Sequence, residues 1–237
     1  MSEPQYRVLG WDSEWFGIPI GRAEVPEITD ASAAEMDAWA RTQGLKCVYV
    51  FTGIAARSAA PPAGFKLMDK RVEYELDPLV LAKEPSDAAD TMRPEEQGEV
   101  CELARQLFND TRFSRDTRFP PARVKELYAE WVRQDSKGGR PGCLVVRHNG
   151  TVSGFITGRT DPADPARGSI GLLGVADSQR GLGLGRNLLD HVCRVFVESG
   201  VKRVTVVTQA SNTAACHLYE GGGHIVASGY WYHRWYD

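Results

Sequence analysis

The chain has 237 residues, of which 42% are apolar and 25% charged, and its formal net charge is -3. This composition is typical of a globular protein with one large core or two small ones. The slightly acidic balance argues against bulk binding to nucleic acid, which needs a strongly basic face to displace counterions. No apolar run approaches the roughly 20 residues needed to cross a bilayer, so we expect no membrane partner.

The cysteines and histidines predict neither a disulfide framework nor a metal site. The five cysteines are widely spaced and form no Cys-x-x-Cys pair, which is typical of reduced thiols. The five histidines show no metal-ligand spacing such as His-Glu-x-x-His. The chain also starts without the basic and apolar regions of a secretory signal. We therefore expect a cytoplasmic protein without a bound metal.

A polar segment between Leu76 and Arg93, including Lys83–Asp87, predicts a boundary between two parts of the chain. We expect an N-terminal α/β domain over residues 1–88 and a second domain over residues 89–237. The modest apolar content of the first part predicts that it packs on the second rather than standing alone.

The sequence of the first part predicts a mixed α/β structure. Asp30 is positioned to cap a helix that ends at Gly44. Two strands are expected after it, over residues 46–52 and 71–76.

The second part shows clearer periodicity. Apolar residues recur at helical spacing over 100–108 and 124–132. Strands over 143–147 and 152–160 follow, and the Asn149-Gly150 pair between them tolerates the positive φ angles of a tight hairpin turn. Together these patterns predict two helices followed by a hairpin.

The rest of the second part alternates strands and helices around a glycine-rich loop. The predicted elements are a strand over 170–176, the loop, a helix ended by Gly200, a strand over 203–208, a helix over 213–220, a Gly221–Gly223 break, and a strand over 225–236. The full order is two helices, four strands, the loop, helix, strand, helix and strand, with the split between the third and fourth strands left open. This is a mixed α/β sandwich around one sheet.

A strand, then Arg180-Gly181-Leu182-Gly183-Leu184-Gly185, then a helix can bind phosphate. Glycines let the backbone approach a ligand closely. The first N–H groups of a helix point at the ligand, and the helix dipole favours an anion there. For a bare Gly-x-Gly-x-Gly, a simple turn is the alternative.

Two other phosphate motifs are excluded by spacing. A Walker A loop ends in Gly-Lys-Ser/Thr, whereas Gly185 is followed by Arg186-Asn187. A dinucleotide-binding unit needs an acidic residue on the next strand. The strand over 202–208 carries none, because Glu198 still belongs to the preceding helix.

The loop and a later segment resemble the two signatures of the GCN5-related N-acetyltransferase (GNAT) superfamily. Arg180-x-x-Gly183-x-Gly185 matches its (Gln/Arg)-x-x-Gly-x-(Gly/Ala) motif. Asn212-x-x-Ala215-x-x-x-Tyr219-Glu220-x-x-Gly223 resembles the second signature. The resemblance implies the GNAT acyl-CoA N-acyltransferase fold with an additional smaller N-terminal α/β domain. It also implies acetyl-CoA as co-substrate and no metal.

Within the superfamily the chain resembles the dTDP-fucosamine acetyltransferases. This similarity is carried by short segments along most of the chain: Trp15-Phe16-Gly17, Ser114-Arg115, Leu127–Trp131, Thr208-Gln209 and Tyr230-Trp231. It implies acetyl transfer to the primary amine of a dTDP-linked aminodeoxysugar.

The resemblance also implies a set of cofactor contacts. The amides that hold the CoA pyrophosphate would belong to Arg180, Gly181, Leu182, Gly183, Leu184 and Gly185. The backbone that pairs with pantetheine would belong to Leu173, Gly174 and Val175. One N–H of that strand would stabilise the oxyanion formed when the amine attacks.

Asn212 and Tyr219 lie seven residues apart, close to two helical turns, and so share a helix face. By resemblance, Asn212 would bond cofactor amides and Tyr219 would be the general acid that protonates the departing thiolate. The alternative for Tyr219 is a half-buried aromatic at a helix end. The strand over 170–176 holds no Asp or Glu, so no general base is named.

The segment between the first two helices of the second part is the expected acceptor site. Guanidinium groups suit a diphosphate and an aromatic face suits a base, and the candidate residues are Arg112, Phe113, Arg115 and Arg118. The alternative is a solvated charged loop. Cys216 is expected to be a small buried residue rather than a nucleophile, and the aromatic run over 230–236 is expected to be a core strand or a pocket wall.

Three function classes follow. The favoured one is acetyl transfer to a small-molecule amine, with a nucleotide sugar as the suspected acceptor. Another small-amine, antibiotic or peptide N-acetyltransferase is the first alternative, and a non-catalytic acyl-CoA-binding sensor is the second. A nucleotide-binding hydrolase is disfavoured because the chain has neither a Lys-Ser/Thr loop nor an acidic metal cluster. The oligomeric state is left open, with a homodimer among the alternatives.

Overall fold

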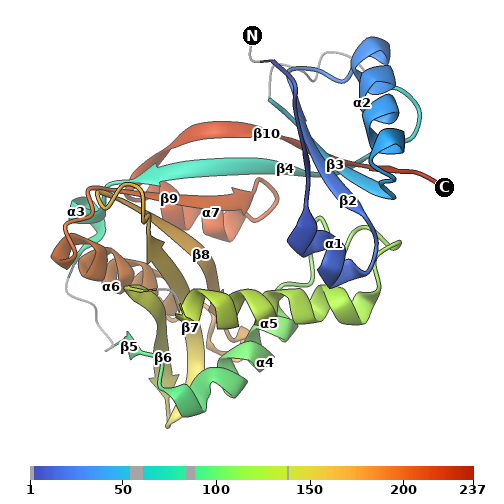
Figure 1. The fold of residues 1–237 in the computed structure, drawn as a ribbon. Helices are drawn as coiled ribbons and strands as arrows, with labels where there is room; N and C mark the ends of the chain where they lie inside the picture. Colours follow the sequence, from blue (N-terminus) through green and yellow to red (C-terminus); the bar gives the residue numbers. More distant parts are fainter. Residues whose placement is uncertain (1–2, 54–60, 84–88, 138) are drawn as a thin grey trace.

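A computed structural model describes residues 3–53, 61–83, 89–137 and 139–237. Within these ranges ten strands form one sheet in the order β1-β2-β3-β10-β4-β9-β8-β7-β6-β5. The pairs β2–β3 and β8–β9 are parallel and the other neighbours are antiparallel. Figure 1 shows the helices lying on both faces of this strongly twisted sheet. The predicted mixed α/β sandwich around one sheet is confirmed.

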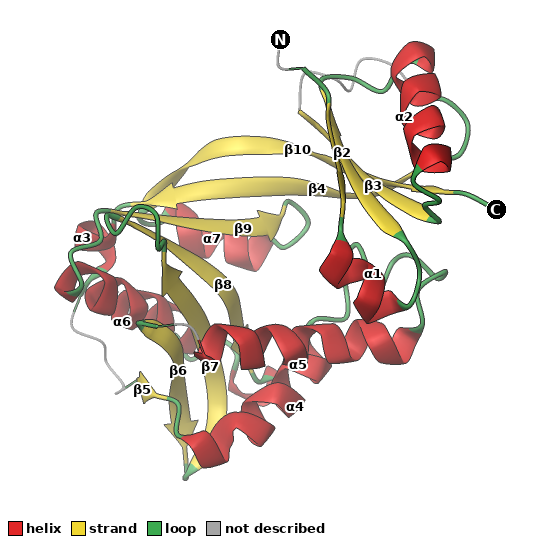
Figure 2. Cartoon of the chain, viewed as in Figure 1, coloured by secondary structure: helices red, strands yellow, loops and turns green. Residues whose placement is uncertain are grey.

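The strands are β1 (Gln5–Val8), β2 (Ile20–Val25), β3 (Cys47–Gly53), β4 (Phe65–Leu76), β5 (Asp90–Thr91), β6 (Pro141–His148), β7 (Thr151–Thr160), β8 (Arg167–Val175), β9 (Arg203–Gln209) and β10 (Gly223–Trp235). The α-helices are α1 (Gly10–Phe16), α2 (Asp30–Thr42), α3 (Pro78–Leu81), α4 (Gln97–Leu107), α5 (Pro121–Lys137), α6 (Leu184–Glu198) and α7 (Thr213–Glu220). Two short 3-10 helices are η2 (Pro94–Glu96) and η3 (Asp177–Gln179). Figure 2 colours helices red, strands yellow and loops green.

Alternating side chains divide the core into two faces of the sheet. On β3 and β10, Tyr49 and Trp231 join the cluster of α1, α4, α5 and the loop between α4 and α5. Their neighbours Val50 and Tyr230 join the cluster of α2 on the opposite face. Successive strand residues point to opposite faces, so one strand serves both layers. We call the side that carries α4 and α5 the α5 face.

The side of the sheet opposite the α5 face also carries α6 and α7. Leu188 and Phe196 of α6 and Tyr219 of α7 are buried in one cluster there. Val206 of β9 and Tyr74 of β4 belong to the same cluster. We call this side the α6 face.

Strand β4 joins the two parts of the chain, because it lies between β9 and β10 and pairs with both. The first part therefore packs on the second, as its modest apolar content predicts. The division into residues 1–88 and 89–237 stays a prediction. Residues 84–88, which hold most of the predicted linker, lie outside the described residues.

The hairpin turn and the end of α6 lie where the sequence predicts them, whereas the cap of α2 does not. Asn149 (φ 51°) and Gly150 (φ 80°) form the hairpin turn with positive φ at both positions, and Gly200 (φ 82°) ends α6 as predicted. The prediction that Asp30 caps α2 is wrong. Thr29 is the cap, because its side chain accepts the Ser32 N–H, and Asp30 is the first helical residue.

The strand count before the glycine loop is also corrected. Three strands, β6, β7 and β8, follow α5 in place of the four expected, because the segment before the loop forms one continuous strand, Arg167–Val175, and not two. The last strand starts at Gly223, inside the predicted glycine break. Strands β1 and β2 and helix α1 were not predicted, since they are short and show little periodicity.

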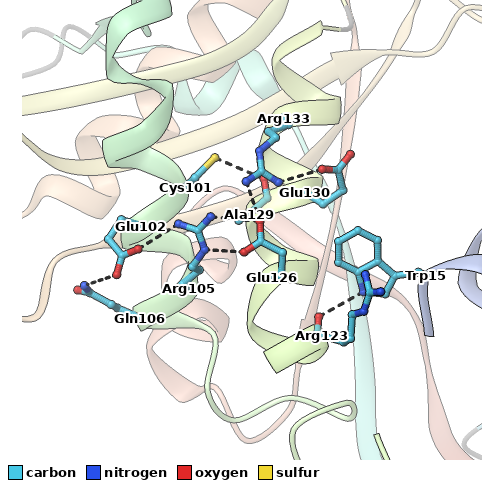
Figure 3. A network of polar contacts seen from close by, with 10 residues as sticks. All are labelled: Trp15, Cys101, Glu102, Arg105, Gln106, Arg123, Glu126, Ala129, Glu130 and Arg133. Carbon is cyan, nitrogen blue, oxygen red and sulfur yellow. Dashed lines mark hydrogen bonds and ion pairs between the residues drawn. The ribbon is translucent and has the colours of Figure 1, made fainter. Parts of the chain in front are cut away.

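Ionic contacts join α4 to α5 (Figure 3). Arg105 Nε of α4 and Arg133 Nη2 of α5 each donate to Glu126 at 2.7 Å. These hydrogen bonds, that from Arg105 foremost, lower the pKa of Glu126 to about 2. Helix α1 reaches the same region, where Trp15 Nε1 donates to the Arg123 carbonyl at 3.2 Å. The network fixes the two helices that cover the α5 face.

We predict that Glu126→Gln lowers the free energy of unfolding at pH 7 by on the order of 1 kcal/mol, because the partly exposed carboxylate anchors two guanidinium groups. A lowered folded-state pKa adds stability above the unfolded pKa, near 4.5, and this is lost as pH falls toward 2. The difference from wild type in urea unfolding should therefore shrink between pH 5 and pH 2. Glu102→Gln, which removes a more exposed carboxylate on the same Arg105, is the control and should change stability less.

Candidate active site

Strands β8 and β9 diverge part-way along their length. They pair only from Arg167↔Arg203 to Ile170↔Val206. On its other edge β8 continues to pair with β7 as far as Val175. Beyond Ile170 the second edge of β8 therefore has no ladder partner in the described chain. Buried backbone groups normally require partners, so this edge can receive an extended ligand.

A β-bulge accompanies the divergence. Leu173 pairs with Ile156, but Ile170 pairs with Gly158, so β8 has one residue more than β7 in this interval. A bulge bends a strand and increases its twist. Since it follows directly on the last β8–β9 pair, it turns β8 away from β9.

Thr157 holds the bulge in place from inside the core. Its hydroxyl accepts the Leu172 N–H at 2.9 Å and donates to Asp135 Oδ2 of α5 at 2.7 Å. The side chain is fully buried. A Cβ on Gly171 would clash with the Asp135 carboxylate. The divergence is therefore locked to helix α5 by one hydroxyl, one carboxylate and one glycine.

A cavity of about 370 Å³ lies where the strands separate. Residues of α5, β7, β8 and β9 line it. Its lining residues are Trp131, Gln134, Asp135, Gly158, Arg159, Ser169, Ile170, Gly171, Leu172, Thr205, Val206 and Val207.

The glycine-rich loop lies between β8 and α6. Gly181 and Gly183 have φ of 81° and 79°, a conformation that side chains with a Cβ rarely adopt. Gly183 is the N-cap of α6 and no side chain caps the helix, so its first N–H groups remain available to an anion. Arg180 pairs with Asp177 at 2.8 Å on the surface, and Leu182 is exposed.

The start of α6 lies close to the free edge of β8. A Cβ on Gly185 would sit 3.8 Å from Leu173 Cδ2, 3.9 Å from Val175 Cγ2 and 3.9 Å from Leu218 Cδ2. The loop, the end of β8 and helix α7 therefore meet at one place. The structure brings together the predicted pyrophosphate loop and the predicted pantetheine strand.

Helix α7 carries the predicted acid and the predicted amide contact. Asn212 is its N-cap, and Asn212 Oδ1 accepts the Ala215 N–H at 3.2 Å. A cofactor contact by Asn212 would therefore use its amide nitrogen. Tyr219 is only 4% exposed and lies on the α6 face. Burial raises the pKa of Tyr219, so its hydroxyl stays protonated at neutral pH. Cys216 is half-buried, and its Sγ lies 3.8 Å from the Gln209 carbonyl.

The four predicted acceptor residues do not form one cluster. Phe113 is 3% exposed and packs among core aromatics such as Phe16 and Trp131. Its ring is part of the core, so the expectation that it offers an open face to a base is corrected. Arg115 is held by Asp110 Oδ1 at 2.6 Å, and the Arg118 guanidinium lies 5.4 Å from the centre of the Trp235 ring.

Arg112 lies over the Phe113 ring, with the guanidinium 4.6 Å from the ring centre, and also reaches Trp231. Its guanidinium lies 4.2 Å from the centre of the Trp231 ring, and that of Arg22 lies 4.9 Å from the same centre. Phe51 packs beside Trp231, with ring centres 5.0 Å apart, and Arg71 lies over Phe51 at 5.8 Å. Three guanidinium groups from β2, β4 and the α4–α5 loop thus gather over aromatic rings on the α5 face.

Arg22, Asp69, Asp135 and Thr157 were not singled out by sequence. Asp69 is 7% exposed and accepts a hydrogen bond at Oδ2 from Gln209 Nε2 at 2.8 Å. Asp69 shares β4 with Glu73 and Glu75, so its acidic side chain alone does not mark it in the sequence. The partnership with Gln209 spans 140 residues of sequence and has no local signal.

Residues 102–222 match the model of the acetyltransferase (GNAT) family. The chain belongs to this family. The match spans both halves of the divergent strand pair, the glycine-rich loop and α7. The mixed sheet with its interrupted β8–β9 ladder is the GNAT fold that the sequence motifs imply.

Relatives and solved structures agree with this assignment. The Bacillus subtilis (strain 168) protein "Spore coat polysaccharide biosynthesis protein SpsD" is 27% identical over 186 residues, which cover 78% of this chain and 58% of SpsD. The Caenorhabditis elegans "N-alpha-acetyltransferase daf-31" is 36% identical over 80 residues, covering 32% of this chain and 44% of the relative. This chain thus spans about half the length of these curated relatives.

A solved GCN5-related N-acetyltransferase from Sphaerobacter thermophilus superposes with a TM-score of 0.67 at 16% identity, covering 98% of this chain and 76% of that one. This likeness supports the fold. In the described ranges no helix is long and apolar enough to cross a membrane. No group of three or more metal-ligand side chains was found among the same residues.

We predict that Thr157→Val lowers the free energy of unfolding by about 1–3 kcal/mol, because it leaves the buried Leu172 N–H and the Asp135 carboxylate without a partner. Urea unfolding measures the loss. Thr160→Val on the same strand is the control, since that hydroxyl bonds the Arg140 carbonyl at an exposed position. Equal stability of the two variants would show that the bulge does not depend on the Thr157 hydroxyl.

Proposed function

We propose that the protein transfers an acetyl group from acetyl-CoA directly to a primary amine. The observation that carries the proposal is the free edge of β8 beside an uncapped glycine-rich helix start. An extended pantetheine arm needs backbone partners, and a diphosphate needs unpaired N–H groups. Both needs are met within a few residues of one another.

The chain's own backbone would bind the cofactor. The amides of Arg180, Gly181, Leu182, Gly183, Leu184 and Gly185 hold the diphosphate of CoA. Leu173, Gly174 and Val175 pair with pantetheine along the free edge of β8, and the Asn212 amide adds a contact from α7. One N–H of that edge hydrogen-bonds the thioester oxygen, which becomes an oxyanion when the amine attacks.

Tyr219 is proposed as the general acid that protonates the departing CoA thiolate. Burial raises the pKa of Tyr219, so the hydroxyl keeps its proton at neutral pH and has one to donate. We therefore expect no decline of kcat on the basic side from Tyr219 below about pH 10.

A nucleotide-linked aminosugar is the proposed acceptor. The relative SpsD is named for polysaccharide biosynthesis, which supports a sugar amine. Arg22 and Arg112 lie over the buried ring of Trp231 and supply positive charge on the α5 face, which suits a diphosphate. Of the residues first expected to bind it, Arg112 keeps this role. Phe113 and Arg115 instead shape the loop that carries Arg112.

Gly183→Ala should raise the Kd for CoA at least tenfold, because its Cβ enters the space of the diphosphate. Isothermal titration calorimetry measures the change. Gly200→Ala is the matched control: it has the same positive φ with nothing within 4 Å. Both variants should lose about 1–2 kcal/mol of stability through backbone strain, but only Gly183→Ala should lose CoA affinity. Equal affinities would rule against the loop assignment.

Tyr219→Phe should lower kcat by about 100-fold or more while leaving CoA affinity near wild type, because only the proton donor is removed. A thiol-release assay with a panel of nucleotide-linked aminosugars measures turnover. Tyr74→Phe, which removes the hydroxyl of a neighbouring buried tyrosine, is the control and should keep kcat within a few-fold. If the wild type binds CoA but releases no thiol with any amine, the protein is a sensor and the proposal fails.

A further inference from the structure

Asp69 on β4 is a buried carboxylate with one oxygen left without a partner. The residue is 7% exposed, and its Oδ1 has no hydrogen-bond partner. Oδ2 is held by Gln209 Nε2 at 2.8 Å. Buried carboxylate oxygens are normally satisfied, since an unpaired one carries a large desolvation cost. An orphan oxygen held in a fixed direction therefore suggests a donor that arrives with a ligand.

The carboxylate lies on the α5 face, at the end of β9. Asp69 is paired directly with Trp231, and directly opposed residues share a face. Its partner Gln209 is the last residue of β9, and Thr205 and Val207 precede it on that strand at alternate positions. These two residues line the cavity between β8 and β9. Asp69 therefore lies on the same face of the sheet as these lining residues, beside the end of β9, without itself lining the cavity.

The charged groups around Asp69 leave its Oδ1 unpaired. Arg115 is electrostatically coupled to it, but the Arg115 guanidinium donates to Asp110, Met68 O and Ser211 Oγ. Arg112 and Arg22 lie over the ring of Trp231. Two titratable groups on other packed elements interact electrostatically with Asp69, namely Tyr128 of α5 and His233 of β10.

We propose that Asp69, oriented by Gln209, is the general base that receives the acceptor amine. The inference rests on the acetyl transfer proposed above. The neutral amine donates an N–H to Oδ1 and attacks the thioester carbonyl, so that the C–N bond forms and the C–S bond breaks. The nitrogen, positive after attack, gives its proton to Oδ1, and the thiolate takes a proton from Tyr219. Asp69 then returns one proton through solvent to the Tyr219 phenolate, which balances the cycle.

The proposal accounts for the strand over 170–176 lacking an acidic residue. The base is supplied by β4, from the first part of the chain, and not by the strand that binds pantetheine. Because β4 lies between β9 and β10, its side chains reach the α5 face beside the cavity. The position of β4 thus gives the N-terminal part a direct role in the chemistry.

Asp69→Asn tests the proposal, because it keeps the shape and an oxygen for Gln209 but removes the proton acceptor. We expect kcat/KM for the amine to fall about 100-fold. CoA affinity by calorimetry should stay at the wild-type value. Asp69→Glu, which keeps a carboxylate, should recover part of the lost rate.

The control is Asp37→Asn, which removes a carboxylate paired with Arg234 on the opposite face and should keep wild-type kcat/KM. If Asp69→Asn does not fold, the test uses Gln209→Leu, which leaves the carboxylate but removes the side chain that donates to it. A decrease of about tenfold in kcat/KM then supports the proposal. A folded Asp69→Asn variant that keeps the wild-type kcat/KM overturns the proposal. Where Asp69→Asn does not fold, a wild-type kcat/KM in Gln209→Leu overturns it. A wild-type enzyme that acetylates no amine refutes the proposed function instead.

Discussion

The interruption of the β8–β9 ladder is the constraint on which the rest of the site depends. A parallel strand pair inside a sheet would normally continue, because each missing rung leaves backbone groups to be satisfied elsewhere. Here the bulge in β8 stops the pairing after Ile170. The Thr157 hydroxyl satisfies the Leu172 N–H and ties the bulge to Asp135. Through this contact the opening in the sheet is coupled to helix α5, and α5 is fixed to α4 by the Glu126 network.

The sequence predicts the parts of this arrangement that are local. Helical spacing locates α4, α5 and α6, and the Asn149-Gly150 pair locates the hairpin, because each signal lies within one element. The glycine-rich loop is also local: its positive φ values need Gly181 and Gly183. The number of strands before the loop could not be predicted in this way. Residues 152–160 and 170–176 are both apolar, and their pattern does not show how many strands they form.

The other parts depend on contacts between distant segments. Arg112, Phe113 and Arg115 look equivalent in sequence as alternating basic and aromatic residues. In the structure Phe113 enters the core, Arg115 is bound by Asp110, and Arg112 turns to Trp231 on a strand more than 100 residues away. Asp69 and Gln209 meet only because β4 is placed beside β9. No local sequence pattern shows on which side of a loop a side chain will lie, or which residue of a neighbouring strand it will contact.

The two proposed proton-transfer residues lie on opposite faces of one sheet. Tyr219 is buried in the cluster of the α6 face, whereas Asp69 shares the α5 face with Trp231. In an unbroken sheet the backbone would separate an acid from a base placed in this way. In the proposed mechanism both would act on one thioester at the gap between β8 and β9, with the base on the amine side and the acid on the sulfur side. The broken ladder would then supply the backbone partners for pantetheine and also the place where the two halves of the proposed proton transfer meet.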